Sequence, residues 1–128
     1  FESAQRDAGW GVVNIDLDHF KQVNDRQGHD QGDQVLIEFT RFLDRCAGMG
    51  DAVVRLGGDE FALLLAGADE ARLQEVVAKL SDGSMQAPCA FSMGSSLREE
   101  GEALSAPLAR ADSRMYSVRA ATRTSAPA

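Results

Sequence analysis

Apolar residues along the chain occur either in short uninterrupted runs or at a helical spacing of three and four. The runs predict buried strands, which need no polar alternation, and the periodic segments predict amphipathic helices. The expected elements are, in chain order, a strand over 11–15, a short helix or turn over 19–28, a helix over 30–46, strands over 52–56 and 61–65, a helix over 70–80, a loop over 81–88, a strand over 89–95 and a helix over about 105–119.

This order of strand, helices, hairpin, helix, strand and helix predicts the α+β class, with a mixed central sheet flanked by helices. The chain has 128 residues and no internal repeat. That length is sufficient to bury a core without disulfides or structural metals. We therefore expect a single domain over residues 1–128, with residues 124–128 as a disordered tail.

The net charge of −7 argues against general nucleic-acid binding, which requires a basic face. No apolar run reaches the roughly 20 residues of a membrane helix, so no membrane contact is expected from this segment. Cys46 and Cys89 lie far apart without metal-type spacing, and both are expected to be buried free thiols. A reducing, cytoplasmic location is therefore expected, which is compatible with a membrane anchor elsewhere in a longer parent protein.

Two acidic residues, Asp59 and Glu60, directly follow the pair Gly57-Gly58 at the centre of the expected hairpin. Glycines supply the positive φ of tight turns and let a ligand approach the bare backbone. Asp16 ends the first apolar run, and neighbouring strands lie about 4.8 Å apart, so Asp16 and Asp59 could share one Mg²⁺. Each acid could instead be a solvated turn residue. Their joint presence beside two glycines favours a metal-dependent phosphoryl-transfer site.

The segment 20–33, which follows the first acidic cluster, is dense in hydrogen-bonding side chains. An asparagine and an aspartate that converge from a turn and a helix start could read the edge of a guanine, and Lys21 could contact phosphate. The alternative is an ordinary loop and a helix N-terminus capped by Asp30 or Asp33. Composition alone favours this alternative.

Four motifs occur along the chain in a fixed order. They are Asp16-x-Asp18-x-Phe20-Lys21-x-x-Asn24-Asp25-x-x-Gly28-His29-x-x-Gly32-Asp33, Arg55-x-Gly57-Gly58-Asp59-Glu60-Phe61, Phe91-Ser92-Met93-Gly94 and Ala111-Asp112-x-x-Met115-Tyr116-x-x-Arg119. Their order and spacing, over about residues 11–123, resemble the GGDEF family of diguanylate cyclases. The resemblance implies a fold similar to nucleotide cyclase and polymerase palm domains.

The resemblance also implies a role for each matching residue. Asp16 and Asp59 would bind Mg²⁺ or Mn²⁺ with the Leu17 carbonyl assisting, and Glu60 would help to activate the attacking 3′-hydroxyl. The implied substrate-binding residues are Asn24 and Asp33 for guanine with His29 nearby, Lys21 and Arg119 for the β and γ phosphates with Arg123 also in reach, and Gly57 and Gly58 for the α-phosphate and ribose.

The implied reaction condenses two GTP molecules into cyclic di-GMP and releases two pyrophosphates. Each domain would hold one GTP, and two domains would face each other so that each 3′-hydroxyl attacks the partner's α-phosphate. A homodimer is therefore implied for turnover. The alternative is a catalytically silent GTP-binding module that regulates a neighbouring domain.

The family's inhibitory product site is usually an Arg-x-x-Asp motif just upstream of the hairpin. Here the window reads Gly48-Met49-Gly50-Asp51, so glycine replaces the arginine while Asp51 and Arg55 remain. Because glycine cannot make a bidentate contact to phosphate or guanine, weak or absent product inhibition through this site is expected.

The two ends of the chain also depart from the family pattern. The last motif usually reads Lys-x-x-Gly-Arg-Asn, whereas this chain has arginine at positions 119 and 123 and no glycine between them. Arginine keeps the charge of lysine but not its shape, and a solvated helix end favoured by the helix dipole is the ordinary alternative. The family's upstream Asp-x-Leu-Thr-Gly-Leu-x-Asn-Arg segment would fall before Phe1. We therefore expect an N-terminally truncated catalytic domain with a sensory or dimerising region upstream.

Overall fold

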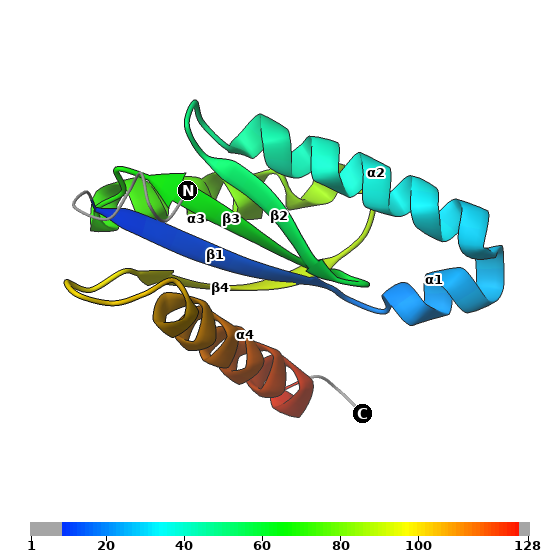
Figure 1. The fold of residues 1–128 in the computed structure, drawn as a ribbon. Coiled ribbons are helices and arrows are strands. Elements are labelled where there is room, and N and C mark those ends of the chain that lie inside the picture. Colours follow the sequence, from blue (N-terminus) through cyan, green and yellow to red (C-terminus); the bar gives the residue numbers. More distant parts are fainter. Residues whose placement is uncertain (1–8, 126–128) are drawn as a thin grey trace.

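One sheet and four main helices make up the part of the chain that the computed structural model describes, residues 9–125, with backbone only over 118–125. The elements are β1 (Trp10–Leu17), α1 (Phe20–Gln27), α2 (His29–Cys46), β2 (Ala52–Gly57), β3 (Glu60–Ala66), α3 (Glu70–Asp82), the short 3₁₀ helix η1 (Ser84–Gln86), β4 (Phe91–Leu97) and α4 (Ser105–Ser125). Helices α2 and α3 lie on one side of the sheet and α4 on the other (Figure 1). This arrangement confirms the predicted α+β class.

The four strands are arranged in the order β2-β3-β1-β4, and each neighbouring pair is antiparallel. The expectation of mixed strand directions is therefore wrong. The chain leaves β1 through α1 and α2 and returns as β2, which runs in the same direction as β1. However, β3 lies between β1 and β2, so these two parallel strands never pair directly.

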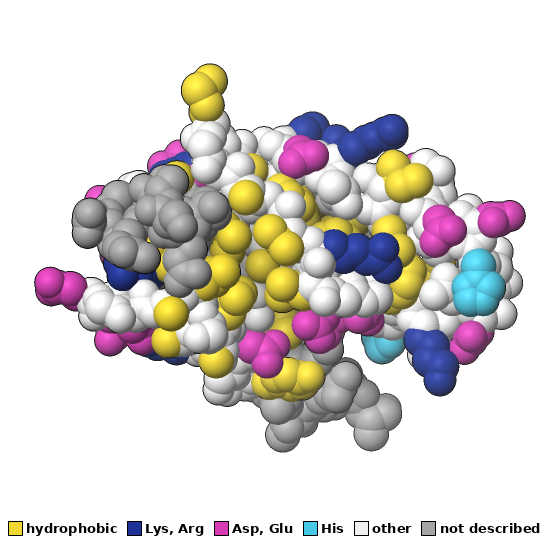
Figure 2. All heavy atoms as spheres, in the orientation of Figure 1, with side chains coloured by type: hydrophobic (Ala, Val, Ile, Leu, Met, Phe, Trp, Pro, Cys, Tyr) yellow, Lys and Arg dark blue, Asp and Glu magenta, His cyan; other side chains and the backbone are white. Residues whose placement is uncertain are grey.

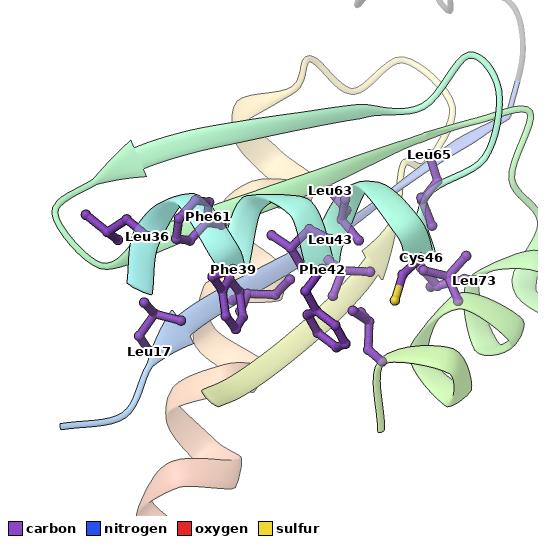
Figure 3. Packing of buried hydrophobic residues seen from close by; sticks show 14 of the residues in the cluster. Leu17, Leu36, Phe39, Phe42, Leu43, Cys46, Phe61, Leu63, Leu65 and Leu73 are labelled. Atoms are coloured by element: carbon purple, nitrogen blue, oxygen red, sulfur yellow. The ribbon is translucent and has the colours of Figure 1, made fainter. Parts of the chain in front are cut away.

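The larger core lies between the sheet and the pair α2 and α3 (Figure 3). Its centre is Phe39 of α2, whose ring centroid lies 5.4 Å from that of Phe61 and 5.3 Å from that of Phe91. Offset and edge-to-face arrangements at this separation add to the free energy of burial. The core fixes α2 against β3 and β4, and thereby fixes the start of α2 relative to the sheet.

The second core lies under α4, where Trp10, Val12, Leu64 and Ala111 are buried. Figure 2 shows this side of the molecule, with hydrophobic side chains gathered over its middle. Helix α4 approaches β4 closely at Gly94, where a Cβ would stand 2.2 Å from the Ala111 carbonyl oxygen and 2.4 Å from the Met115 nitrogen. Only glycine fits there.

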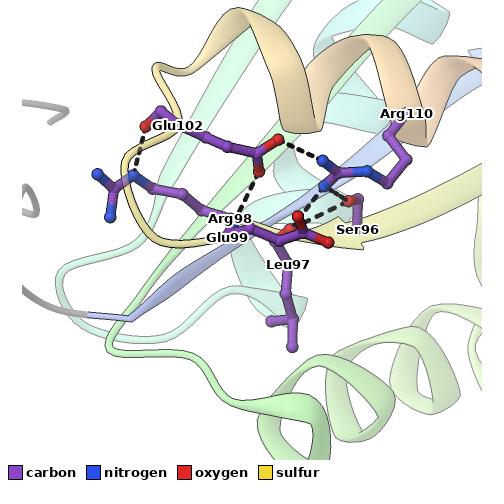
Figure 4. A network of polar contacts seen from close by, with 6 residues as sticks. All are labelled: Ser96, Leu97, Arg98, Glu99, Glu102 and Arg110. Carbon is purple, nitrogen blue, oxygen red and sulfur yellow. Dashed lines mark hydrogen bonds and ion pairs between the residues drawn. The ribbon is translucent and has the colours of Figure 1, made fainter.

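A network of polar contacts fixes the loop from β4 to α4 (Figure 4). The Arg110 guanidinium donates to Ser96 Oγ at 2.8 Å and to the Leu97 carbonyl at 2.9 Å, and it pairs with the Glu102 carboxylate. The pKa of Glu102 is lowered by hydrogen bonds from the Glu99 N–H and from Arg110. The network joins the first half of α4 to the last residues of β4.

Several boundaries differ from those predicted. Strand β1 continues to Leu17, so Asp16 lies within the strand instead of closing it, and β4 is shifted to 91–97. Part of the predicted loop 81–88 is helical, in the end of α3 and in η1. Helix α4 continues to Ser125, which contradicts the expected tail at its first two positions; residues 126–128 lie outside the described part.

Both cysteines are free, but only Cys46 is buried, whereas Cys89 is half-buried. The prediction of two buried thiols is therefore half correct. Among the residues described, no helix combines the length and apolar character that a membrane crossing requires.

Candidate active site

Three polar residues lie side by side across the sheet, at the end nearest to α1. Asp16 of β1 is paired with Glu60 of β3 on one side and with Ser92 of β4 on the other. Side chains of directly opposite residues point to the same face, with Cα atoms about 4.5–5.5 Å apart. Asp16 is 7% exposed and Glu60 is half-buried. Strand register therefore brings two of the predicted catalytic carboxylates together.

The third carboxylate, Asp59, stands in the two-residue turn between β2 and β3. The Leu17 N–H donates to the Asp59 carbonyl oxygen at 3.0 Å, which fixes the turn beside the end of β1. Three residues of the predicted metal site, Asp16, Leu17 and Asp59, thus meet at one place. The bond is a main-chain contact, so it leaves the Asp59 carboxylate available for another partner.

The glycines of the turn do not have the role that tight-turn geometry suggested. Neither Gly57 nor Gly58 is among the glycines with positive φ in the described residues. Instead, a Cβ built on either would meet nothing within 4 Å. The space above their backbone is open, which agrees with the second expected role, close approach of a ligand to bare main chain.

Arg55 holds the same turn from β2. Its Nε donates to the Gly57 carbonyl at 3.2 Å and its Nη2 to the Gly58 carbonyl at 2.9 Å. The strand pairing is irregular between Arg55 and Gly57, so the turn has fewer ladder hydrogen bonds than an ideal hairpin. The family resemblance links Arg55 only to the remnant of an inhibitory site, and no sequence motif predicts its contacts to the turn.

The donor atoms at this end of the sheet suit Mg²⁺ or Mn²⁺, because carboxylate and carbonyl oxygens are the ligands that hard divalent ions prefer. The implied set contains only two side chains, Asp16 and Asp59, with the Leu17 carbonyl. Within residues 9–125, no group of three or more His, Cys, Asp or Glu side chains is arranged to hold a metal. An ion held by Asp16, Asp59 and the Leu17 carbonyl would therefore take its remaining ligands from water or substrate.

The expected guanine-reading residues lie at the junction of α1 and α2, which are separated by Gly28 alone. Gly28 has a φ of 87°, and its N–H donates to the Asn24 carbonyl at 2.9 Å. A Cβ at Gly32 would stand 1.7 Å from Asn24 Oδ1, so the Asn24 amide lies against the first turns of α2, at the residue that precedes Asp33. The two residues predicted to read guanine are thereby brought near each other.

The alternative for the segment 20–33, an ordinary loop and a helix start capped by Asp30 or Asp33, agrees only partly with the structure. The N-cap residue of α2 is Gly28, without a side-chain cap, so neither Asp30 nor Asp33 caps the helix. His29, Asp33 and Lys21 are exposed. Their side chains are accessible to a ligand, as the binding hypothesis requires.

Two further contacts join β4 to this end of β1. Ser92 Oγ donates to Asp18 Oδ1 at 2.9 Å, and the Asp18 N–H donates to the Ala90 carbonyl at 2.9 Å.

Burial, with a smaller contribution from nearby Asp18, raises the pKa of Cys89 to about 11. The Cys89 thiol therefore stays protonated near neutral pH and is no candidate nucleophile.

The remaining predicted residues lie elsewhere or are not described. Asp51 sits near the opposite end of β3, where it accepts from the Ala66 N–H at 2.9 Å. It is thus separated from Glu60 by the length of the strand, about 20 Å. The side chains of Arg119 and Arg123 lie outside the described part of the chain.

Comparison with known proteins identifies this arrangement. The protein-family model named for the diguanylate cyclase GGDEF domain matches residues 1–125 of the sequence. The chain belongs to the GGDEF family. The diguanylate cyclase TpbB of Pseudomonas aeruginosa is 44% identical over 90 residues, which are 67% of this chain and 20% of that protein. The diguanylate cyclase DgcM of Escherichia coli is 50% identical over 56 residues, 44% of this chain and 14% of that protein. This GGDEF chain therefore spans a fifth or less of the length of these two curated relatives.

Solved structures agree with the family assignment. Diguanylate cyclase SiaD of Pseudomonas aeruginosa, crystallised with its activator SiaC, has a TM-score of 0.80 at 30% identity, covering 94% of this chain and 50% of that one. The isolated GGDEF domain of TpbB has a TM-score of 0.73 at 31% identity, covering 97% and 77%. The GGDEF domain of DgcB from Caulobacter crescentus, in complex with cyclic di-GMP, has a TM-score of 0.78 at 23% identity, covering 93% and 78%; that identity supports the fold alone.

Proposed function

We propose that this GGDEF domain is an active diguanylate cyclase, which condenses two GTP molecules into cyclic di-GMP and two pyrophosphates in a homodimer. The observation that carries the proposal is the meeting of Asp16, Asp59 and Glu60 at one end of the sheet, beside an open glycine backbone. A degraded turn would be expected of a domain that has lost activity, and here each of these residues is present.

In this proposal, the two groups of residues hold different parts of GTP. Asn24 and Asp33 hydrogen-bond the guanine edge, with His29 nearby. Lys21 neutralises charge on the terminal phosphates, and the α-phosphate and ribose lie on the backbone of the glycine pair. The residues proposed to bind metal and those proposed to bind guanine lie on neighbouring elements, because only Asp18 and His19 separate β1 from α1.

Mg²⁺ or Mn²⁺, when bound by Asp16 and Asp59, supplies positive charge for the phosphoryl oxygens of the substrate. The chain's own contribution is to hold these two carboxylates and to place Glu60 where it can accept the proton of an attacking 3′-hydroxyl. Positioning and charge neutralisation account for most of the rate enhancement in phosphoryl transfer. A main-chain tether such as the Leu17–Asp59 bond serves this positioning.

A homodimer belongs to the proposal because one domain offers one set of guanine-reading residues, while the product contains two guanines. Two facing domains would each present one GTP, so that each 3′-hydroxyl attacks the other's α-phosphate. We propose that a region outside this chain, or a partner protein, promotes that encounter. Since GTP is an intracellular nucleotide, we also place the domain in the cytoplasm.

The second candidate is a silent GTP-binding module that regulates a neighbouring domain. The altered closing motif, with arginine at positions 119 and 123 and no glycine between them, favours it. GTP binding without turnover is the behaviour that separates it from a cyclase.

The deciding experiment measures cyclic di-GMP formation from GTP and Mg²⁺ at rising protein concentration. A rate that grows faster than linearly with concentration is expected, because two domains, each with one bound GTP, must meet. The same chain fused to a dimeric coiled coil serves as a second sample. If that fusion binds GTP but forms no cyclic di-GMP, the silent module is the better description.

A further inference from the structure

The carboxylate of Asp51, the surviving residue of the family's inhibitory motif, is fully engaged within the chain. Its side chain is 1% exposed. Oδ1 accepts from the Ala66 N–H at 2.9 Å, and Oδ2 accepts from the Gly48 N–H at 2.7 Å and from Arg72 Nη2 at 2.8 Å. A ligand could reach Asp51 only if these bonds were broken.

Arg72 reaches Asp51 from the first turn of α3, where its own N–H donates to the N-cap side chain of Asp69 at 2.8 Å. Its backbone is therefore fixed at the helix start, and its side chain is 27% exposed. The pair joins three parts of the fold: the loop that follows α2, the end of β3 and the beginning of α3. Removing the cationic partner of a buried carboxylate is destabilising, so this pair should contribute to the stability of the fold.

The same guanidinium occupies the space beside position 48. A Cβ built on Gly48 would stand 2.6 Å from Arg72 Nη2 and 3.2 Å from Asp51 Oδ2. Any side chain at position 48, the place of the family's arginine, would therefore have to displace Arg72. Conversely, Arg72 brings to Asp51 the positive charge that the missing arginine would have carried.

We propose that Arg72 substitutes from within the chain for the lost arginine: it neutralises Asp51 and fills the side-chain space of position 48, so that the segment 48–51 is a structural tie and not a nucleotide site. Insensitivity to product is then caused by two features, the glycine and the Arg72–Asp51 pair. Restoring arginine at position 48 alone does not recreate a product site. This inference deepens the proposed function, since it concerns regulation by the product of that reaction.

The first test is a double-mutant cycle in melting temperature, with Gly48→Arg, Arg72→Ala and the combination of both. Each single substitution is expected to lower the melting temperature by several degrees, the first by displacing Arg72 and the second by leaving Asp51 without its cation. In the double variant the arginine introduced at position 48 meets no second guanidinium, so Gly48→Arg is expected to cost less there than in the wild type. Arg41→Ala, which removes an exposed arginine of α2, controls for charge alone. Additive shifts would overturn the proposal.

The second test titrates cyclic di-GMP into the wild type and into Gly48→Arg by calorimetry. No binding is expected for either protein. In the wild type Arg72 covers Asp51, and in Gly48→Arg the Asp51 carboxylate still accepts from the Ala66 and Gly48 N–H groups. Binding by the wild type that disappears in Arg72→Ala, or binding gained by Gly48→Arg alone, would overturn the proposal. The titration uses added product and needs no turnover, so a failure of the proposed cyclase activity would leave its result readable. A parallel titration with GTP and Mg²⁺ tests the substrate site separately.

Discussion

The Oδ1 atom of Asn24 lies over Gly32, at 1.7 Å from the position that a Cβ there would occupy. This contact is possible only because position 32 carries no side chain. Gly32 itself is buried within α2, and its neighbour Asp33 is exposed. The glycine thus lets the Asn24 side-chain amide pack against the backbone of α2 one residue before Asp33, which explains structurally why this position of the motif is a glycine.

Gly32→Ala is expected to displace the Asn24 amide and to reduce the preference for GTP over ATP by about tenfold, the value of one good hydrogen bond to a charged or polar partner. The helix itself should not suffer, since alanine is the better helix former by roughly 1 kcal/mol. Competition binding with GTP and ATP measures the preference. In an Asn24→Ala background the same change should have no further effect. A GTP-to-ATP preference that stays at the wild-type value in Gly32→Ala or in Asn24→Ala would argue against guanine reading.

The fold class was predictable because the core elements have strong periodicity. Helix α2, with its apolar residues at three and four, was expected over 30–46 and is observed over His29–Cys46. The direction of the strands was not predictable in the same way. Which strand pairs with which depends on β3 inserting between β1 and β2, a long-range choice that no local pattern encodes.

The site was predictable where a motif names a side chain and unpredictable where a contact depends on three-dimensional packing. Asp16, Asp59 and Glu60 could be named from the motif. The register places Asp16 opposite Glu60, and the main-chain bond from Leu17 to Asp59 holds the turn beside them. The contact of Arg72 with Asp51 could not be predicted, because the two residues lie 21 positions apart in sequence. No local pattern in α3 distinguishes Arg72 from the other polar residues on the surface of that helix.

Asp59→Ala is expected to lower Mg²⁺-dependent turnover by at least about a hundredfold, because one of the two side-chain ligands proposed for the metal is lost. Stability should change by less than about 0.5 kcal/mol, since the bond from Leu17 is to the Asp59 main-chain carbonyl and survives the substitution. Product formation and urea unfolding measure the two effects. Asp82→Ala, at the exposed end of α3, is the matched control. Full activity of Asp59→Ala with Mg²⁺ would rule out its assignment as a ligand.

Gly94→Ala is expected to destabilise the fold by about 1–3 kcal/mol, because the new methyl group overpacks the contact between β4 and α4. Both atoms that it would meet, the Ala111 carbonyl oxygen and the Met115 nitrogen, belong to the backbone and cannot rotate away. Urea unfolding measures the loss. Gly57→Ala adds the same methyl group where nothing lies within 4 Å, and should leave stability nearly unchanged; equal effects of the two substitutions would contradict the packing argument.

Arg55→Ala is expected to loosen the turn that carries Asp59, because the two carbonyl contacts at Gly57 and Gly58 are lost together. We expect turnover to fall about tenfold, since hydrogen bonds to a charged donor contribute roughly 1.5–3 kcal/mol and these are exposed. Stability should change little, because the side chain lies on the surface.

Arg55→Lys separates geometry from charge in the same experiment. A lysine keeps the positive charge, but its compact ammonium lacks the planar fork that spans two carbonyl oxygens. If Arg55 acts by holding the turn, the lysine variant should resemble the alanine variant in turnover, and hydrogen exchange of the amides at 58–60 should quicken in both. Full turnover in the lysine variant would instead assign Arg55 a purely electrostatic role.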